Sequence, residues 1–124
     1  MASEEQMTAA VHGYVAAFDK GDADAAVALF AADASVEDPV GTPAKVGHDA
    51  IKAFYEASMA TGAKLRLEGP IRCANDSAAF AFCVELTLDG KAVTVDVIDV
   101  FRFDNEGKVI EMKAYFGPSN MTGL

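Results

Sequence analysis

The spacing of apolar residues changes at Gly62, and this change constrains the fold more than any other feature of the sequence. Before Gly62, apolar side chains recur every three or four residues, which is the spacing of amphipathic helices. After Gly62 they alternate with polar residues, as in strands that are buried on one face. We therefore expect an α+β fold, with three helices from the first half of the chain packed on a curved, mainly antiparallel sheet.

Three helices are predicted before Gly62. Ser3 and Gln6 have the spacing of a capping box, and Gly21 ends the first helix. Its apolar stripe contains Met7, Val11, Tyr14 and Phe18. Asp22 can cap a second helix, whose predicted inward residues are Ala26, Val27, Phe30 and Ala31. The third helix has one face formed by Ile51, Phe54, Tyr55, Ser58 and Met59.

The strand segments are bounded by turn residues. A short extended segment is predicted at 35–38, and strands are predicted at 64–68, 71–74, 79–88, 93–103 and 109–116. Asp89-Gly90 is a strong signal for a two-residue hairpin. A chain of 124 residues fits one domain, so residues 1–124 are expected to form a single folded unit.

The charge of the chain limits its partners. Its formal net charge is −9 and its pI is about 4.5, so its surface is expected to repel nucleic acids and anionic membranes. No stretch reaches the ~18 apolar residues of a membrane span, and the N-terminus lacks the pattern of a signal peptide. We expect a cytoplasmic protein with Cys73 and Cys83 as free thiols, the alternative being a disulfide between them. His12 and His48 have no neighbouring cysteine, so no metal site is predicted.

Asp99 breaks an otherwise apolar strand face. The other members of that face are Val93, Val95, Val97, Phe101 and Phe103. A buried carboxylate is costly, and no Lys or Arg lies on the same face, so Asp99 is expected to be paired elsewhere or protonated. A protonated acid can donate a hydrogen bond and would be useful in catalysis. The alternative is a β-bulge that turns Asp99 to solvent.

Three other polar residues are candidates for the same site. Tyr14 and Tyr55 lie in apolar helix faces, where their hydroxyls need partners; each could also be an ordinary core tyrosine bonded to a backbone carbonyl. With Asp99 they could form one hydrogen-bond network. Asp38 ends an extended segment before Pro39 and is either a functional carboxylate or a turn residue.

The inward apolar positions of the later strands predict either a filled core or a pocket for a rigid apolar ligand. The residues proposed as pocket walls are Phe54, Phe80, Phe82, Val84, Val95, Phe101, Met112 and Phe116. Periodicity alone does not distinguish these two possibilities.

From about Met7 to about Asn120, the chain resembles the steroid Δ5-isomerases, or ketosteroid isomerases, of the nuclear-transport-factor-2-like superfamily. The order and spacing of several short segments carry this resemblance, namely residues 14–17, 27–31, 36–41, 53–55, 78–82, 98–103 and 116–117. The resemblance implies a cone-shaped, cystatin-like α+β domain, an apolar steroid substrate, no cofactor and a homodimer. Relatives with a further tyrosine differ from this chain at Phe30.

The resemblance also implies the role of each candidate residue. Asp38 matches the family's catalytic base, Tyr14 and Asp99 match its two oxyanion-hole donors, and Tyr55 matches the phenol behind Tyr14. The implied reaction is the isomerisation of a 3-oxo-Δ5-steroid to the 3-oxo-Δ4 form by proton transfer through a dienolate.

Two alternatives remain at this point. A related hydrolase or cyclase would keep the fold, and epoxide hydrolases of this type use an Asp-Arg-Asp arrangement for which Arg72 and Arg102 are the candidate arginines. The other alternative is a non-catalytic dimer module that binds an apolar ligand.

Overall fold

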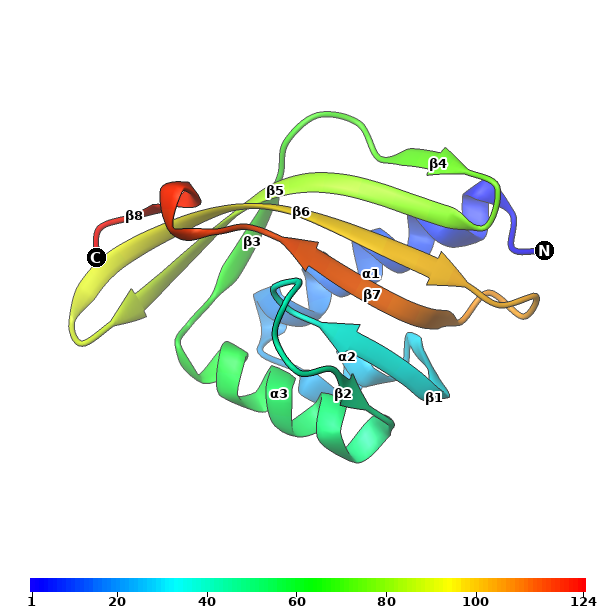
Figure 1. Ribbon diagram of the computed structural model, residues 1–124, viewed down its shortest axis with the longest axis horizontal. Helices are drawn as coiled ribbons and strands as arrows, with labels where there is room; N and C mark the ends of the chain where they lie inside the picture. The colour runs from blue at the N-terminus through cyan, green and yellow to red at the C-terminus, as the bar shows by residue number, and fades with distance from the viewer.

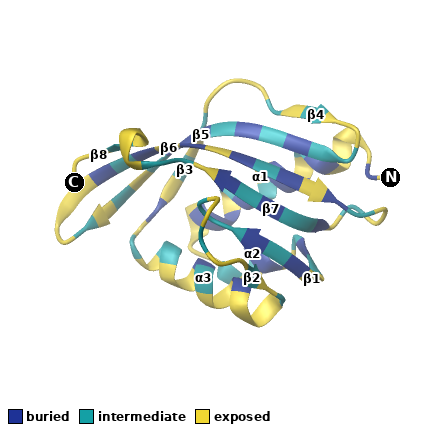
Figure 2. Cartoon of the chain, in the orientation of Figure 1, coloured by how far each residue is buried: buried dark blue, intermediate teal, exposed yellow.

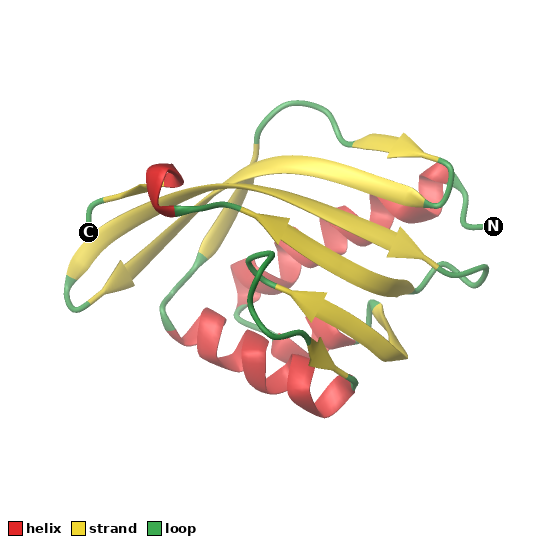
Figure 3. Cartoon of the chain, in the orientation of Figure 1, coloured by secondary structure: helices red, strands yellow, loops and turns green.

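A computed structural model describes residues 1–124 and places three helices before the long strands, as predicted (Figures 1 and 3). The helices are α1 Glu4–Lys20, α2 Ala23–Val27 and α3 His48–Ala60, with a short 3-10 helix, η1, at Pro118–Asn120. The strands are β1 Phe30–Glu37, β2 Lys45–Val46, β3 Lys64–Leu67, β4 Arg72–Ala74, β5 Ser77–Leu88, β6 Lys91–Phe103, β7 Val109–Tyr115 and β8 Met121–Thr122. No helix is long and apolar enough to cross a membrane.

One curved sheet contains all the strands, and the helices pack against one of its faces (Figure 1). The main strand order is β2-β1-β7-β6-β5-β3, with β4 paired to β5 and β8 paired to β6. Strands β5, β6 and β7 form the predicted antiparallel meander, whereas β1 runs parallel to β7. The sheet is therefore mixed, and the α+β prediction of three helices on a mainly antiparallel sheet is confirmed.

The helix boundaries follow the predicted caps. The Ser3 hydroxyl accepts a hydrogen bond from the Gln6 backbone at 3.0 Å, and the Gln6 side chain accepts one from the Ser3 backbone at 2.8 Å. Gly21 ends α1 in the left-handed region at φ 65°, where glycine meets no Cβ penalty. Asp22 then caps α2 by accepting a hydrogen bond from the Ala25 backbone at 3.0 Å.

The prediction for α2 was wrong at its C-terminal end. This helix ends at Val27, and Phe30 and Ala31 instead begin β1. Phe30 pairs with Val109 of the parallel strand β7, and the Val109 amide donates to the Leu29 carbonyl at 2.9 Å. These contacts with a distant segment hold the backbone at Phe30 in an extended conformation. The Phe30 side chain is nevertheless buried in the core, as predicted.

The β5–β6 hairpin contains most of the buried residues of the sheet (Figure 2). Asp89 and Gly90 form its turn with φ values of 51° and 76°, as the sequence predicts. The two strands keep an unbroken register from Ser77 opposite Arg102 to Leu88 opposite Lys91. Because this register is unbroken, side chains alternate regularly along β6, and every second residue from Val93 to Phe103 is buried on the face that carries the helices.

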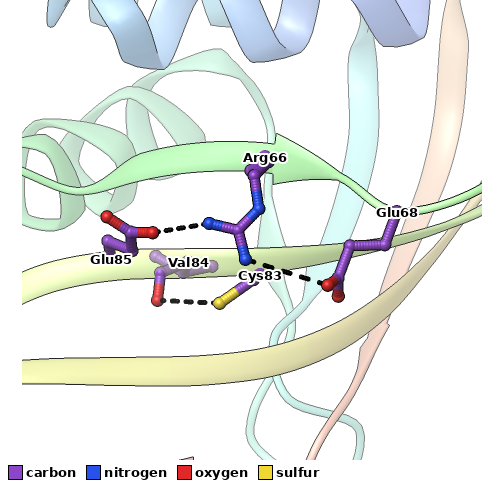
Figure 4. A network of polar contacts seen from close by, with 5 residues as sticks. All are labelled: Arg66, Glu68, Cys83, Val84 and Glu85. Atoms are coloured by element: carbon purple, nitrogen blue, oxygen red, sulfur yellow. Dashed lines mark hydrogen bonds and ion pairs between the residues drawn. The ribbon is translucent and has the colours of Figure 1, made fainter.

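The opposite face of the sheet is polar near β3 and β5 (Figure 4). Arg66 of β3 donates to Glu85 at 2.6 Å and lies 3.8 Å from Glu68. Beside it, the Cys83 thiol contacts the Val84 carbonyl at 3.9 Å. Cys73 is also a free thiol, so the alternative of a disulfide does not apply.

Candidate active site

A cavity of about 280 Å³ lies between helices α1 and α3 and the sheet, close to the lower end of the ~300–1,000 Å³ typical of ligand pockets. Most of its wall is apolar. It is lined by Tyr14, Phe18, Asp38, Phe54, Tyr55, Ser58, Leu65, Phe82, Val84, Val95, Val97, Asp99 and Phe116. The structure thus brings Tyr14, Asp38, Tyr55 and Asp99 together in one apolar cavity, although they come from four separate segments of the chain.

Asp99 is buried in the middle of β6, with Phe80 opposite it on β5 and Ala114 opposite it on β7. Its exposed fraction is 1%, so the alternative in which a bulge turns it to solvent does not apply. The irregularity in the β6–β7 pairing falls after Arg102, beyond this position. Neither carboxyl oxygen has a hydrogen-bond partner within the chain.

The environment of Asp99 favours its protonated form. Burial is the main cause that raises the pKa of its carboxyl well above the usual value, and the nearby Asp38 adds to the effect. A carboxylate loses its hydration when it is buried, and no cation compensates for that loss at Asp99. A protonated carboxyl can instead donate one hydrogen bond into the cavity.

Tyr14 reaches the same cavity from α1 and is held by edge-on aromatic contacts. Its ring centre lies 5.2 Å from that of Phe18 and 5.2 Å from that of Phe101, with interplanar angles of 63° and 89°. Burial, followed by the nearby Tyr55, Asp99 and Asp38 groups, raises the pKa of the Tyr14 phenol well above its ordinary value. The phenol therefore keeps its proton and remains a hydrogen-bond donor at neutral pH.

Tyr55 lies behind Tyr14 on α3, with the two ring centres 5.7 Å apart. It is completely buried, and its hydroxyl has no hydrogen-bond partner within the chain. Burial is again the main cause that raises the pKa of this phenol. The three buried oxygens of Tyr55 and Asp99 are costly to leave unpaired, so protonated Asp99 offers an unused donor to a ligand oxygen in the cavity.

Asp38 follows β1 at the side of the cavity and is half-buried. Burial raises the pKa of its carboxyl to about 6, against the opposing effect of the Lys45 ammonium. Asp38 is therefore mostly ionised at pH 7, unlike Asp99, and can accept a proton. The preceding Glu37 is engaged differently, since its carboxylate accepts a hydrogen bond from the Gly41 amide at 2.8 Å.

The predicted pocket walls divide into two groups. The cavity lining includes Phe54, Phe82, Val84, Val95 and Phe116. The other three predicted wall residues, Phe80, Phe101 and Met112, lie outside the lining. They are at most 1% exposed, and the Phe80 and Phe101 rings pack 5.0 Å apart, so they form the closed core beside the cavity.

Four further residues line the cavity: Phe18, Ser58, Leu65 and Val97. Phe18 lies one helical turn after Tyr14, and Val97 lies two residues before Asp99 on the same strand face. The sequence could therefore have predicted both as cavity residues from the positions of Tyr14 and Asp99. Ser58 donates its hydroxyl hydrogen to the Phe54 carbonyl at 3.0 Å. Leu65 is placed by its pairing with Val84, which is a tertiary contact.

Comparisons with known proteins agree with this architecture. Residues 11–112 match the SnoaL-like domain family. The chain is 38% identical over 117 residues to a curated steroid Delta-isomerase from Nocardioides simplex, and the match covers 94% of each chain. It is also similar, with a TM-score of 0.93, 26% identity and full coverage of both chains, to the structure of the epoxide hydrolase/cyclase-like enzyme SalBIII, described for pyran ring formation in the polyether salinomycin.

Proposed function

This chain belongs to the SnoaL-like domain family, and we propose that within that family it is a steroid Δ5-isomerase, which converts 3-oxo-Δ5-steroids to conjugated 3-oxo-Δ4-steroids. One observation carries the proposal. A buried acid without a partner, Asp99, shares an apolar cavity with the phenol of Tyr14 and with the ionised carboxylate of Asp38. These are the two donors and the base that an enolisation needs.

The proposed reaction begins with proton removal by Asp38. Its carboxylate takes a proton from carbon 4 of the steroid, and the electron pair of the broken C–H bond moves toward the oxygen at carbon 3. The resulting dienolate carries its negative charge on that oxygen. Protonated Asp38 then returns the proton to carbon 6, so that the double bond becomes conjugated with the carbonyl and no atom is gained or lost.

Tyr14 and Asp99 stabilise the dienolate in this mechanism. Each donates a hydrogen bond to the oxygen on which charge develops, in a cavity whose apolar walls strengthen that interaction. Loss of one donor of this kind costs about 10²–10³ in rate, and a well-placed base contributes about 10²–10⁴. Tyr55 supports the Tyr14 ring from behind at 5.7 Å.

The cavity walls suit a rigid, apolar substrate. Phe54, Phe82 and Phe116 contribute aromatic surface, and Val84 and Val95 contribute branched aliphatic surface. Such a lining gains hydrophobic stabilisation from a ring system without demanding polar partners along its length. The proposed chemistry uses side-chain proton transfer only.

The hydrolase alternative is less well supported by the arginine positions. Arg102 lies on the outward face of β6, 3.6 Å from Glu111. Arg72 donates to the Pro70 carbonyl at 2.9 Å. Neither arginine lines the cavity, so an Asp-Arg-Asp arrangement around bound water has no arginine in place. A purely ligand-binding module would have no need of a buried, unpartnered Asp99.

We also propose that the protein is a homodimer that uses the outer face of its sheet. Val40, Ile98 and Tyr115 are 43%, 49% and 48% exposed and line one depression, and Ile98 and Tyr115 lie opposite each other on β6 and β7. A second copy would remove this apolar surface from water. Sedimentation velocity of the wild-type protein is expected to show a dimer, and Ile98→Asp is expected to shift it toward monomer; a monomeric wild type would contradict the proposal.

A spectroscopic assay tests the isomerase proposal. The protein is mixed with 5-androstene-3,17-dione, and the ultraviolet absorbance of the conjugated enone is followed. We expect acceleration over buffer, its loss in Asp38→Asn, and its retention in Glu106→Gln, which alters an exposed carboxylate in the turn between β6 and β7. A rate equal to that of buffer would overturn the proposal, and full activity in Asp38→Asn would overturn the assignment of the base.

A further inference from the structure

A single ammonium group lies beside the wall of the cavity near Asp38. Lys45 belongs to β2, and its Nζ atom lies 4.9 Å from the centre of the Phe54 ring. Phe54 lines the cavity that contains Asp38. A cation over an aromatic face is attracted by the electrons of the ring, which restrains an otherwise flexible lysine.

The strand register brings Lys45 close to Asp38. Lys45 pairs with Val36 of β1, and Asp38 lies in the bend that begins immediately after this strand, two residues beyond Val36. Asp38 and the Phe54 ring line the same cavity, and the Lys45 ammonium lies over that ring. The two charges therefore share one partly buried site, where electrostatic interactions are stronger than in water.

Lys45 forms no ion pair with another carboxylate. The ion pairs of the chain involve Lys52, Arg66 and Arg102, and Lys45 is in none of them. The other titratable groups that face Asp38 are Asp99 from β6, Tyr14 from α1 and Tyr55 from α3, and none of these is a cation.

We propose that Lys45 is a positioning residue that keeps the base anionic: its ammonium, held over the Phe54 ring, supplies the counter-charge for the Asp38 carboxylate. This inference rests on the proposed isomerase function. The direction of the electrostatic effect supports it, because burial raises the pKa of Asp38 and Lys45 is the group that lowers it. Without Lys45, burial would act unopposed and Asp38 would hold its proton at higher pH.

The pH dependence of kcat/KM in Lys45→Met tests the proposal. The acid limb is expected to move to higher pH, with activity falling about threefold at pH 6 and remaining close to wild type at pH 8. Lys45→Arg keeps the positive charge and the stacking on Phe54, so it is expected to restore the wild-type profile. Lys91→Met is the matched control, because it removes one exposed charge at the β5–β6 turn.

Two results would overturn this role for Lys45. An equal loss of activity at pH 6 and pH 8 would indicate a structural or substrate-binding role, and an unchanged acid limb would show that the charge does not act on Asp38. A titration of the Asp38 carboxyl carbon by NMR in the ligand-free protein, assigned with Asp38→Asn, gives a second measurement. If the wild-type protein has no isomerase activity, the proposed function fails, whereas the titration still decides whether Lys45 acts on Asp38.

Discussion

Replacement of Asp99 by Asn should change how stability depends on pH. In the folded protein, burial keeps the pKa of Asp99 well above the usual value, so the folded state holds a proton that the unfolded chain has released. Above the unfolded pKa of about 3.9, the free energy of unfolding therefore falls as pH rises, until pH passes the folded pKa. Asparagine is neutral in both states and removes this contribution.

The size of the effect follows from one proton. One bound proton corresponds to about 1.4 kcal/mol per pH unit, so the wild type should lose up to about 2.7 kcal/mol relative to Asp99→Asn between pH 5 and pH 7, the upper bound for one proton held throughout. The 1% exposure of Asp99 keeps its carboxyl desolvated and its folded pKa raised, whereas the slope itself depends only on the one proton bound. Asp38 titrates in both proteins, so its contribution largely cancels in the difference.

Urea-induced unfolding at pH 5, 6 and 7, at one fixed protein concentration, measures the difference. Glu106→Gln is the control, because it removes an exposed carboxyl in the turn between β6 and β7, away from the cavity and from the proposed dimer face. A difference between wild type and Asp99→Asn that stays constant from pH 5 to pH 7 would falsify the neutral state of Asp99.

Four further predictions concern activity and packing. The acid limb of kcat/KM should have its midpoint near pH 6, because Asp38 must be ionised to act as base and burial raises its pKa to about 6; a midpoint near pH 4 would contradict this. Tyr14→Phe should lower kcat by about 10²–10³ with a smaller effect on KM, as steady-state kinetics would show, since it removes a donor needed mainly in the transition state. Phe101→Ala should lower the free energy of unfolding by about 3–5 kcal/mol in urea titrations, because Phe101 is completely buried between aromatic neighbours. In contrast, Val95→Trp should raise KM by filling the cavity, with a smaller loss of stability, and an unchanged KM would indicate that the ligand binds elsewhere.

Much of the architecture was predictable because its causes are local. The helical stripe that contains Tyr14, the caps at Ser3 and Asp22 and the Asp89-Gly90 turn each depend on residues within one or two turns of chain. The alternation along β6 also identified Asp99 as an acid on an apolar face, which the structure places at 1% exposure. The period of apolar residues shows which face of a helix or strand is buried, and Asp99 stands out as the one acid on the buried face of β6.

Contacts between distant segments determined the features that were missed. Phe30 is in a strand because it pairs with Val109 in a parallel register, a contact that no helical pattern reveals. Likewise, Phe80 and Phe82 share one strand face and stack 5.5 Å apart, yet only Phe82 lines the cavity. Depth within a core depends on how the side chains of several elements fill the space, so alternation along one strand cannot predict it.

The sequence by itself therefore determined the order of helices and strands and the presence of an acid where an apolar residue was expected. The tertiary structure decided which groups share a cavity. It brings Asp38 from the end of β1 and Tyr14 from α1 to Asp99, and it sets Lys45 beside Phe54. The physical reason is that burial and charge act through space: Asp38 and Asp99 are the same residue type, and their different depths and neighbours favour an ionised carboxylate in one and a protonated carboxyl in the other.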